Sequence, residues 1–184
     1  MRALPRVHKE GMMGSRLRIV EAVAVCATAV LLTACNAKDY QIAKVAPTSG
    51  NNAKGEVRFY KVDGGVRVIA SIEGLTPGKH GFHVHEKGDC SAPDAASAGG
   101  HFNPTGSPHG APTAPPTARH AGDLGNLEAD SNGKANYDRV DSMLVYESLS
   151  GLSILVHAGE DDFVTQPSGN SGARVGCGVI EPAR

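Results

Sequence analysis

The chain has 184 residues, of which 40% are hydrophobic, only 4% are aromatic and none is Trp, and it carries 18 Lys and Arg against 19 Asp and Glu. This length suits a single globular domain. The nearly neutral charge excludes a nucleic-acid binder, because phosphate contacts require a clear excess of Lys and Arg. Two counts stand out, 4 Cys and 8 His, because both residue types can bind metals or form cross-links.

Residues 16–35 predict an export signal. Basic residues precede an uncharged run over 22–34, which is shorter than the roughly 20 apolar residues of a membrane-spanning helix. The run ends in Leu32-Thr-Ala-Cys35, which resembles the lipobox of bacterial lipoproteins, whose Cys becomes the lipid-carrying first residue. We therefore expect a signal peptide over 1–34, lipid attachment at Cys35, and a membrane-anchored protein of the periplasm or cell envelope. The alternative is a plain secretory leader that ends near a Cys.

Removal of this leader changes both the charge and the cysteine count. It takes away five basic and two acidic residues, which leaves 13 Lys and Arg against 17 Asp and Glu, so the mature chain is acidic. Cys26 is lost with the leader and Cys35 carries the anchor. Only Cys90 and Cys177 then remain to pair in an oxidising compartment.

The segment that follows the anchor is polar and shows no periodic pattern, so we expect a flexible tether over 35–54 and a folded domain over 55–184. At the start of that domain, residues 57–60 and 66–72 alternate between apolar and polar side chains around a Gly-rich turn. This alternation with a period of two predicts a β-hairpin.

Further short strand-like runs are separated by Gly-, Asp- and Ser-rich turns, and no window shows a sustained helical period. These runs cover residues 81–86, 134–140, 143–147, 152–157 and 175–180. Two long stretches, 89–118 and 158–174, are too rich in Gly, Pro, Ser and Ala for regular structure, and long loops inside a compact domain are usually functional or disordered. The sequence thus predicts an all-β sandwich or barrel with two long loops.

The histidines favour a metal site. His83 and His85 are two residues apart in a predicted strand, so both imidazoles project from one face while Val84 packs on the other. The first long loop and the residues after it add His101, His109, His120 and Asp123, and His157 ends a later strand. Three His and one carboxylate would fill a tetrahedral zinc site. A second set of nitrogen ligands without a thiolate favours Cu(II), Zn or Ni. The number of ligands therefore indicates two metals.

Four motifs in this order resemble the copper/zinc superoxide dismutase family, in its bacterial exported branch. They are Gly81-Phe-His83-Val-His85-Glu86, Gly99-Gly-His101-Phe-Asn-Pro104, His120-Ala-Gly-Asp123-Leu-Gly125-Asn126 and Gly169-Asn-Ser-Gly172-Ala-Arg174-Val-Gly-Cys177-Gly-Val-Ile180. The resemblance implies an eight-stranded Greek-key β-barrel, an immunoglobulin-like sandwich with two long functional loops. It also implies an enzyme that converts two superoxide anions and two protons to dioxygen and hydrogen peroxide.

The resemblance assigns one copper and one zinc ion to each subunit. The copper ligands would be His83, His85, His101 and His157, and the zinc ligands would be His101, His109, His120 and Asp123. His101 would therefore bridge the two metals as an imidazolate and take part in catalysis.

Other residues receive supporting roles from the same resemblance. Arg174 would be the catalytic arginine beside copper, where a guanidinium binds a small anion by directed hydrogen bonds. Asp161 would link a copper-ligand and a zinc-ligand histidine, and His80 would bind backbone near the ligands without being a ligand itself. Cys90 and Cys177 would form the intrasubunit disulfide.

Two departures and several alternatives remain open. The Pro-rich segment 110–119 is longer than in animal members, which puts the zinc-loop geometry in question, and Ser168 stands where many members have threonine. A zinc hydrolase of the metallo-β-lactamase type would require a His-x-His-x-Asp-His motif that the chain lacks. An anchored protein that only buffers copper and zinc is the non-enzymatic alternative. Because the family includes monomers and dimers, a homodimer is compatible with the sequence.

Overall fold

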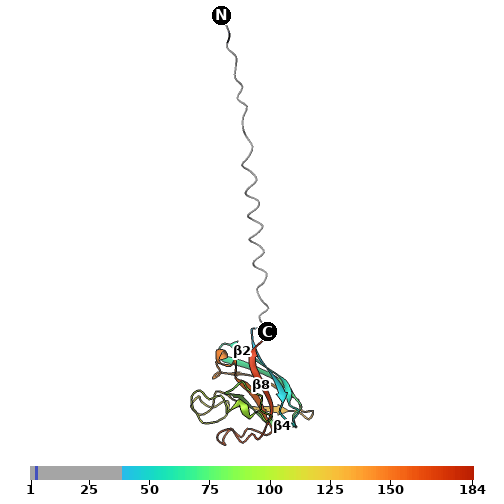
Figure 1. The fold of residues 1–184 in the computed structure, drawn as a ribbon. Coiled ribbons are helices and arrows are strands. Elements are labelled where there is room, and N and C mark those ends of the chain that lie inside the picture. Colours follow the sequence, from blue (N-terminus) through green and yellow to red (C-terminus); the bar gives the residue numbers. More distant parts are fainter. Residues whose placement is uncertain (1–2, 4–38) are drawn as a thin grey trace. The chain divides into compact units, whose positions relative to one another are not determined.

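The computed structural model describes residue 3 and residues 39–184, and within this part the chain forms a closed antiparallel β-barrel (Figure 1). The strands are β1 (Gln41–Pro47), β2 (Lys54–Val62), β3 (Gly65–Glu73), β4 (Gly78–His85), β5 (Asp123–Ala129), β6 (Ala135–Asp141), β7 (Ser153–His157) and β8 (Arg174–Pro182). Two short 3-10 turns, η1 (Ala96–Ala98) and η2 (Tyr146–Ser148), interrupt the loops. The predicted leader over 1–34 and the predicted lipid site Cys35 lie outside the described residues, apart from Ala3.

The strands follow one another around the barrel in the order β1, β2, β3, β6, β5, β4, β7, β8, and β8 pairs again with β1. The connections from β3 to β4 and from β6 to β7 cross between non-adjacent strands, as in a Greek key. The prediction of an all-β, eight-stranded barrel is therefore confirmed.

Alternation of side chains explains how the barrel acquires its core. In β3, Val66, Val68, Ala70 and Ile72 are buried, whereas the residues between them face outward. The predicted hairpin pairs β2 with β3 in this register, so that Val57 and Phe59 join the same core. From His80 to His85, strand β4 is buried on both faces, because one face meets the core and the other lies beneath the long loops.

The predicted tether is wrong over most of its length. Residues 41–47 form β1, which pairs with β2 on one side and with β8 on the other. Its inward positions are Gln41, Ala43 and Val45. A glutamine and an alanine at buried positions hide the apolar alternation, and the strand is recognisable only through its pairing. The folded domain thus begins near Gln41 rather than at residue 55.

Two further differences concern single elements. The run 143–147 does not form a strand, because it turns through η2 immediately after β6. A strand that the sequence did not predict, β5, begins at Asp123 and places this carboxylate at the barrel wall. None of the described helical turns is long and apolar enough to cross a membrane.

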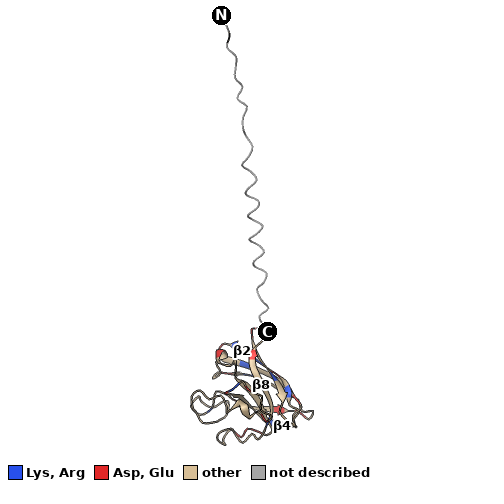
Figure 2. Cartoon of the chain, viewed as in Figure 1, with Lys and Arg blue, Asp and Glu red and all other residues tan. Residues whose placement is uncertain are grey.

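Charged residues of both signs occur along the barrel strands (Figure 2). Several form exposed ion pairs, such as Arg67 with Asp138 at 2.6 Å and Lys79 with Glu160 at 2.7 Å. Exposed pairs of this kind stabilise a fold by at most about 1 kcal/mol each. We therefore attribute the stability of the barrel mainly to its apolar core.

Candidate metal centre

The site is built on the outer face of β4. Val84 points inward and is fully buried in the core, whereas His83 and His85 project from the opposite face. Both histidines are nevertheless almost completely buried, because the two long loops cover this face of the barrel. The His-x-His spacing therefore acts as the sequence predicts: one strand presents two imidazoles to the same region.

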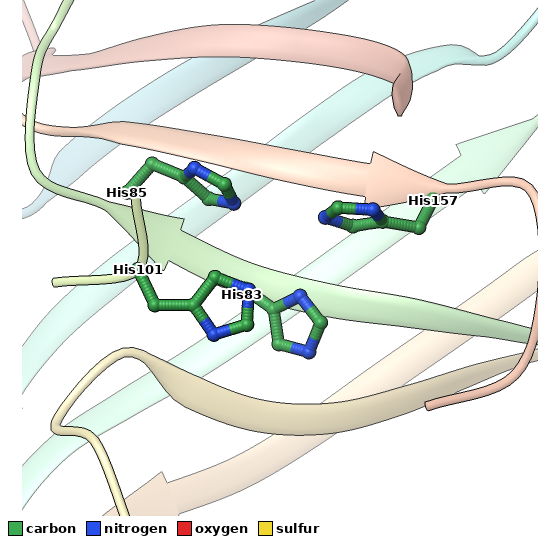
Figure 3. Close-up of side chains that lie close together, drawn as sticks. All are labelled: His83, His85, His101 and His157. Atoms are coloured by element: carbon green, nitrogen blue, oxygen red, sulfur yellow. The ribbon is translucent and has the colours of Figure 1, made fainter. Parts of the chain in front are cut away.

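Strand pairing brings two further histidines to the pair on β4 (Figure 3). Strand β7 pairs with β4 and ends at His157. The first long loop returns to the edge of β4 and forms a bridge between His85 and His101. Each of the four residues offers one ring nitrogen to a cluster in which these nitrogens lie within 4.8 Å of one another, and the cluster comprises His83, His85, His101 and His157.

Hydrogen bonds decide which nitrogen of each ring is free. His85 Nδ1 lies 3.0 Å from Gly99 O, and His157 Nδ1 lies 3.2 Å from Gly172 O, so these nitrogens carry the ring proton and donate hydrogen bonds to backbone carbonyls. His83 Nε2 lies 2.8 Å from Asp161 Oδ2. Such partners fix the tautomer and orientation of metal-binding imidazoles.

The remaining nitrogens of these rings are buried without a hydrogen-bond partner; they are His83 Nδ1, His85 Nε2, His101 Nε2 and His157 Nε2. A buried polar atom without a partner is costly and rare. Four unpartnered nitrogens that converge on one point instead suit a cation with imidazole ligands. The donor set thus fits a copper ion on an observation independent of the family resemblance.

Burial also favours the metal-binding form of these rings. Desolvation lowers the pKa of His83 to about 4 and that of His157 to about 3, and it lowers the pKa of His85 well below the ordinary value. The neutral imidazole is the form that binds a metal. At neutral pH these three side chains therefore require no deprotonation before an ion enters.

A second cluster, formed by His101, His109, His120 and Asp123, lies next to the first. Asp123 Oδ1 lies 2.8 Å from His101 Nδ1, 3.0 Å from His109 Nδ1 and 3.2 Å from His120 Nδ1. Ligand atoms placed tetrahedrally 2.0–2.1 Å from a zinc ion are about 3.3 Å apart. The three distances from Asp123 Oδ1, together with 3.4 Å between the Nδ1 atoms of His101 and His120, lie near this spacing, and the long Pro-rich segment 110–119 does not prevent this arrangement.

The electrostatics of the second cluster favour a cation. Burial opposes ionisation of Asp123, but hydrogen bonds from His101 and His109 hold the pKa of its carboxyl well below the ordinary value. Burial likewise opposes protonation of His109, but Asp123 and Asp161 raise the pKa of its ring to about 9. A metal ion at His109 Nδ1 therefore competes with a proton for this position.

His101 belongs to both clusters. Its Nδ1 faces Asp123 Oδ1 in the second cluster, and its unpartnered Nε2 faces the first. Asp161 connects the clusters a second time, because its Oδ2 lies 2.8 Å from His83 Nε2 and its Oδ1 lies 2.9 Å from His109 Nε2. The site is therefore one unit, in which the two ligand clusters share the ring of His101 and are joined again through the carboxylate of Asp161.

The structure places His80 behind the first cluster. Its Nδ1 lies 2.7 Å from His157 O and its Nε2 lies 2.8 Å from Thr76 O. Both nitrogens therefore face backbone carbonyls, so His80 supports the backbone of His157 and faces neither cluster.

Arg174 lies at the start of β8, opposite His157 in the strand register. Its guanidinium donates to Ala95 O and to Gly99 O, both at 2.5 Å. Gly99 O is also the acceptor of His85 Nδ1, so one carbonyl positions both the arginine and a histidine of the first cluster. A cavity of about 560 Å³ opens above these groups and is lined by Arg174, His85, His101, His120, His157 and six further residues.

The disulfide between Cys90 and Cys177 ties the first long loop to β8. A small apolar cluster of Ala95, Ala98 and Leu155 packs beneath the bridge. The same loop carries Ala95 O and Gly99 O, which accept hydrogen bonds from Arg174. The disulfide therefore holds these two carbonyls close to β8, the strand that contains Arg174.

Arg119 is a structural part of the site that sequence reasoning did not identify. It is 2% exposed, forms a buried ion pair with Asp141 at 2.9 Å, and donates to Asp123 O at 3.3 Å. Its position immediately before His120 was the only signal in the sequence. An arginine in a polar loop is more commonly exposed, so burial could not be inferred without the fold.

Comparisons with known proteins agree with this geometry. The family model for copper/zinc superoxide dismutase (SODC) matches residues 53–180. Among curated proteins, the Cu-Zn superoxide dismutase of Paramecium bursaria Chlorella virus 1 is 45% identical over 141 residues, which cover 71% of this chain and 74% of the viral protein. The Cu-Zn superoxide dismutase 2 of Mesembryanthemum crystallinum is 43% identical over 150 residues, which cover 76% of this chain and 94% of the plant protein.

Two other relatives carry different names. The copper chaperone for superoxide dismutase of Rattus norvegicus is 41% identical over 146 residues, covering 75% of this chain but only 52% of the chaperone. The crystal structure of the clock protein EA4 superposes with a TM-score of 0.70 at 37% identity, covering 81% of this chain and 98% of EA4. A barrel with two adjoining His clusters, matched over most of its length by the family model, shows that this chain belongs to the copper/zinc superoxide dismutases, a family of oxidoreductases.

Proposed function

We propose that this protein removes superoxide at the cell envelope, as an exported and lipid-anchored enzyme that holds one copper and one zinc ion per subunit. The observation that carries the enzymatic part is the arrangement around His101: two clusters of buried ligand atoms share this ring, and Arg174 lies at the cavity above the first of them.

The first cluster would hold copper through His83 Nδ1 and through the Nε2 atoms of His85, His101 and His157. The second would hold zinc through Asp123 Oδ1 and the Nδ1 atoms of His101, His109 and His120. Bound copper supplies one-electron chemistry, in which one superoxide gives up an electron and leaves as dioxygen and a second superoxide gains that electron and leaves, with two protons, as hydrogen peroxide. Zinc has no redox chemistry, and bound there it would stabilise the loop that carries its ligands.

The residues of this chain would then bind and orient the anion. The guanidinium of Arg174 stays charged at neutral pH, and its contacts with Ala95 O and Gly99 O hold it beside the cavity. A fixed guanidinium donates directed hydrogen bonds to a small anion. His101 Nε2, which faces the first cluster, is the atom of this ring that can take up a proton when it does not hold copper.

The experiment that tests this function measures metal content and superoxide consumption together, in the natural sequence and in Arg174→Ala. We expect one copper and one zinc per chain in both proteins, with superoxide consumption about tenfold or more slower in Arg174→Ala, because local positive charge accelerates capture of an anion by factors of this size. Arg174→Lys should recover part of the rate because it retains the charge. A natural protein that holds both metals but consumes no superoxide would instead be a metal buffer.

The cellular location is supported by two features. The leader ends in the Leu-Thr-Ala-Cys motif at Cys35, and a disulfide such as Cys90–Cys177 persists in oxidising compartments. With β1 beginning at Gln41, residues 36–40 link the anchor to the barrel. Expression of the full chain should place the protein in the membrane fraction, and Cys35→Ala should release it. Recovery of the unaltered protein in the soluble fraction would show that the leader is a plain secretory signal.

A further inference from the structure

Gln166 lies in the long loop between β7 and β8, and its side chain binds the backbone of His109 in the other long loop. Gln166 Oε1 accepts a hydrogen bond from His109 N at 2.8 Å, and Gln166 Nε2 donates one to His109 O at 2.9 Å. One side-chain amide therefore satisfies both backbone polar groups of a histidine that lies 57 residues away along the chain.

Two other residues of the same loop contact the ring of His109. Asp161 Oδ1 lies 2.9 Å from His109 Nε2. Gly169 passes so close that a Cβ atom at this position would lie 2.7 Å from the same nitrogen. With its backbone bound by Gln166 and its Nε2 bound by Asp161, His109 presents Nδ1 to Asp123 Oδ1 at 3.0 Å.

The segment that carries Gln166 is held by its own hydrogen bonds. The carboxylate of Asp162 accepts hydrogen bonds from Val164 N, Thr165 N and Thr165 Oγ1, at distances of 2.6–2.9 Å. Gly169 N donates to Thr165 O at 2.7 Å, and Asp162 N donates to Gly169 O at 2.9 Å. The turn over 161–169 is thus an ordered unit, and Gln166 joins this unit to the loop that bears His109.

The two residues after Gln166 belong to a different part of the site. Pro167 and Ser168 line the cavity that also contains Arg174 and His157. Gln166 therefore lies between a ligand of the second cluster and the wall of the cavity above the first cluster, which is where the anion would enter.

We propose that Gln166 is a positioning residue that holds His109 in place to bind zinc and, through the same contact, sets the wall of the anion cavity at Pro167 and Ser168. This inference rests on the proposed function for the identity of the metals. The amide is suited to the role because it combines one acceptor with an NH2 donor, whereas a carboxylate only accepts. Groups that orient metal ligands in this way typically contribute 10- to 100-fold to metal affinity.

The test compares Gln166→Ala and Gln166→Glu with the natural sequence, each loaded with zinc alone and titrated with a competing chelator. We expect zinc binding to weaken about tenfold or more in Gln166→Ala. Gln166→Glu should also weaken it, because its carboxylate would face His109 O without a proton to donate. Val164→Ala is the matched control, since Val164 lies in the same turn and is 77% exposed, and the zinc affinity of this variant should not change.

A second measurement, the affinity for azide, reports on the position of the cavity wall. In copper- and zinc-loaded protein, the dissociation constant of azide, measured from the visible spectrum, should change by roughly threefold or more in Gln166→Ala, because a displaced wall alters a site that depends on ångström-scale geometry. Val164→Ala should bind azide like the natural protein. Thermal unfolding of the metal-free variants verifies that each one is folded.

The outcomes separate this inference from the proposed function. If the natural protein binds zinc and Gln166→Ala and Gln166→Glu bind it within twofold of the same affinity, Gln166 has no positioning role, whatever the enzymatic activity. If zinc binding weakens as expected while the natural protein consumes no superoxide, the proposed function fails and the role of Gln166 stands. A natural protein that binds no zinc would overturn both.

Discussion

Tyr137 places a polar hydroxyl in the core of the barrel, where it is buried and hydrogen-bonded. The ring packs edge-on against Phe82, and the hydroxyl donates a hydrogen bond to Leu124 O at 2.9 Å. Burial raises the pKa of Tyr137 to about 12, because the ionised phenolate would lose its hydration. The group therefore stays neutral in the folded barrel under conditions that ionise it in the unfolded chain.

This shift predicts a loss of stability in alkaline solution. Because the pKa is higher in the folded state than in the unfolded state, where it is about 10, the contribution of Tyr137 is complete below pH 10 and disappears as the pH rises toward 12. The free energy of unfolding should fall by about 2–3 kcal/mol over this window. Tyr137→Phe should be about 1 kcal/mol less stable at neutral pH and should show a smaller fall. Urea unfolding at several pH values measures this. An equal fall in the free energy of unfolding between about pH 10 and pH 12 for the natural protein and for Tyr137→Phe would contradict the prediction.

Gly169 illustrates a contact that tolerates no side chain. Its φ is +68°, and a Cβ atom would lie 1.8 Å from Asp161 Oδ1, the oxygen that binds His109. Gly169→Ala should therefore displace Asp161 and His109 in addition to straining the backbone.

A control at Gly64 separates the cost of backbone strain from the cost of displacing Asp161 and His109. Gly64 also has a positive φ, +84°, but no atom lies within 4 Å of its added Cβ. Gly64→Ala should cost only the backbone strain, about 1–2 kcal/mol, and leave zinc binding unchanged. Gly169→Ala should lower stability by more and weaken zinc binding about tenfold. Equal behaviour of the two variants in unfolding and in zinc titration would show that the close approach of Gly169 to Asp161 has no effect on the site.

Between elements, the buried pair of Arg119 and Asp141 connects the second cluster to the end of β6. Asp141 also accepts hydrogen bonds from Met143 N at 2.8 Å and from Leu144 N at 3.2 Å, which turns the chain away from the barrel after β6. Arg119 in turn donates to the carbonyl of Asp123 at the start of β5. The pair thus fixes the ligand loop relative to two neighbouring strands.

Loss of this pair should be costly because it leaves a buried charge without its partner. Asp141→Asn should destabilise the protein by about 3 kcal/mol. Asp138→Asn removes the carboxylate of an exposed pair with Arg67 and should change stability by less than about 1 kcal/mol. Chemical denaturation of both variants measures the contrast, and a cost at Asp141 no larger than that at Asp138 would show that the buried pair contributes little.

The whole molecule has an unusual charge distribution for a protein that captures an anion. Residues 35–184 carry 13 Lys and Arg against 17 Asp and Glu. The residues that line the cavity include Arg174 as the single Lys or Arg, together with the carboxylate of Glu86. The attraction of Arg174 therefore acts at short range against a net repulsion of the whole domain.

The opposition between the attraction of Arg174 and the net negative charge of the domain predicts that the rate of superoxide consumption depends only weakly on salt concentration. Because salt screens long-range repulsion as well as attraction, the rate of superoxide consumption should change little between low and high ionic strength. Ser168→Lys adds a cation at the cavity wall and should raise the rate several-fold at low ionic strength, with a steep decline as salt is added. Stopped-flow or pulse-radiolysis rates at several salt concentrations test this. A natural protein whose rate falls steeply with salt would point to a positive field that these residues do not provide.

At this scale the sequence by itself determined the fold class, the β2–β3 hairpin and the pairing of His83 with His85 on one strand face. Each depends on a local period of two, which is visible in consecutive residues. The other candidate ligands also stand out in the sequence as His and Asp residues of the loops and strand ends, and the family resemblance divided them between two ions. The structure places all of them in two adjoining clusters. Their assignment to copper and zinc stays a prediction.

Only the tertiary structure decided the rest. It showed that residues 41–47 are a barrel strand, because the pairing of β1 with β2 and β8 compensates for a weak apolar pattern. It also determined which ring nitrogens are free, that Arg119 is buried beside Asp141, and that Gln166 binds His109. These contacts join residues far apart in the chain through loops without periodicity. Their geometry therefore depends on how the barrel closes, which no local pattern encodes.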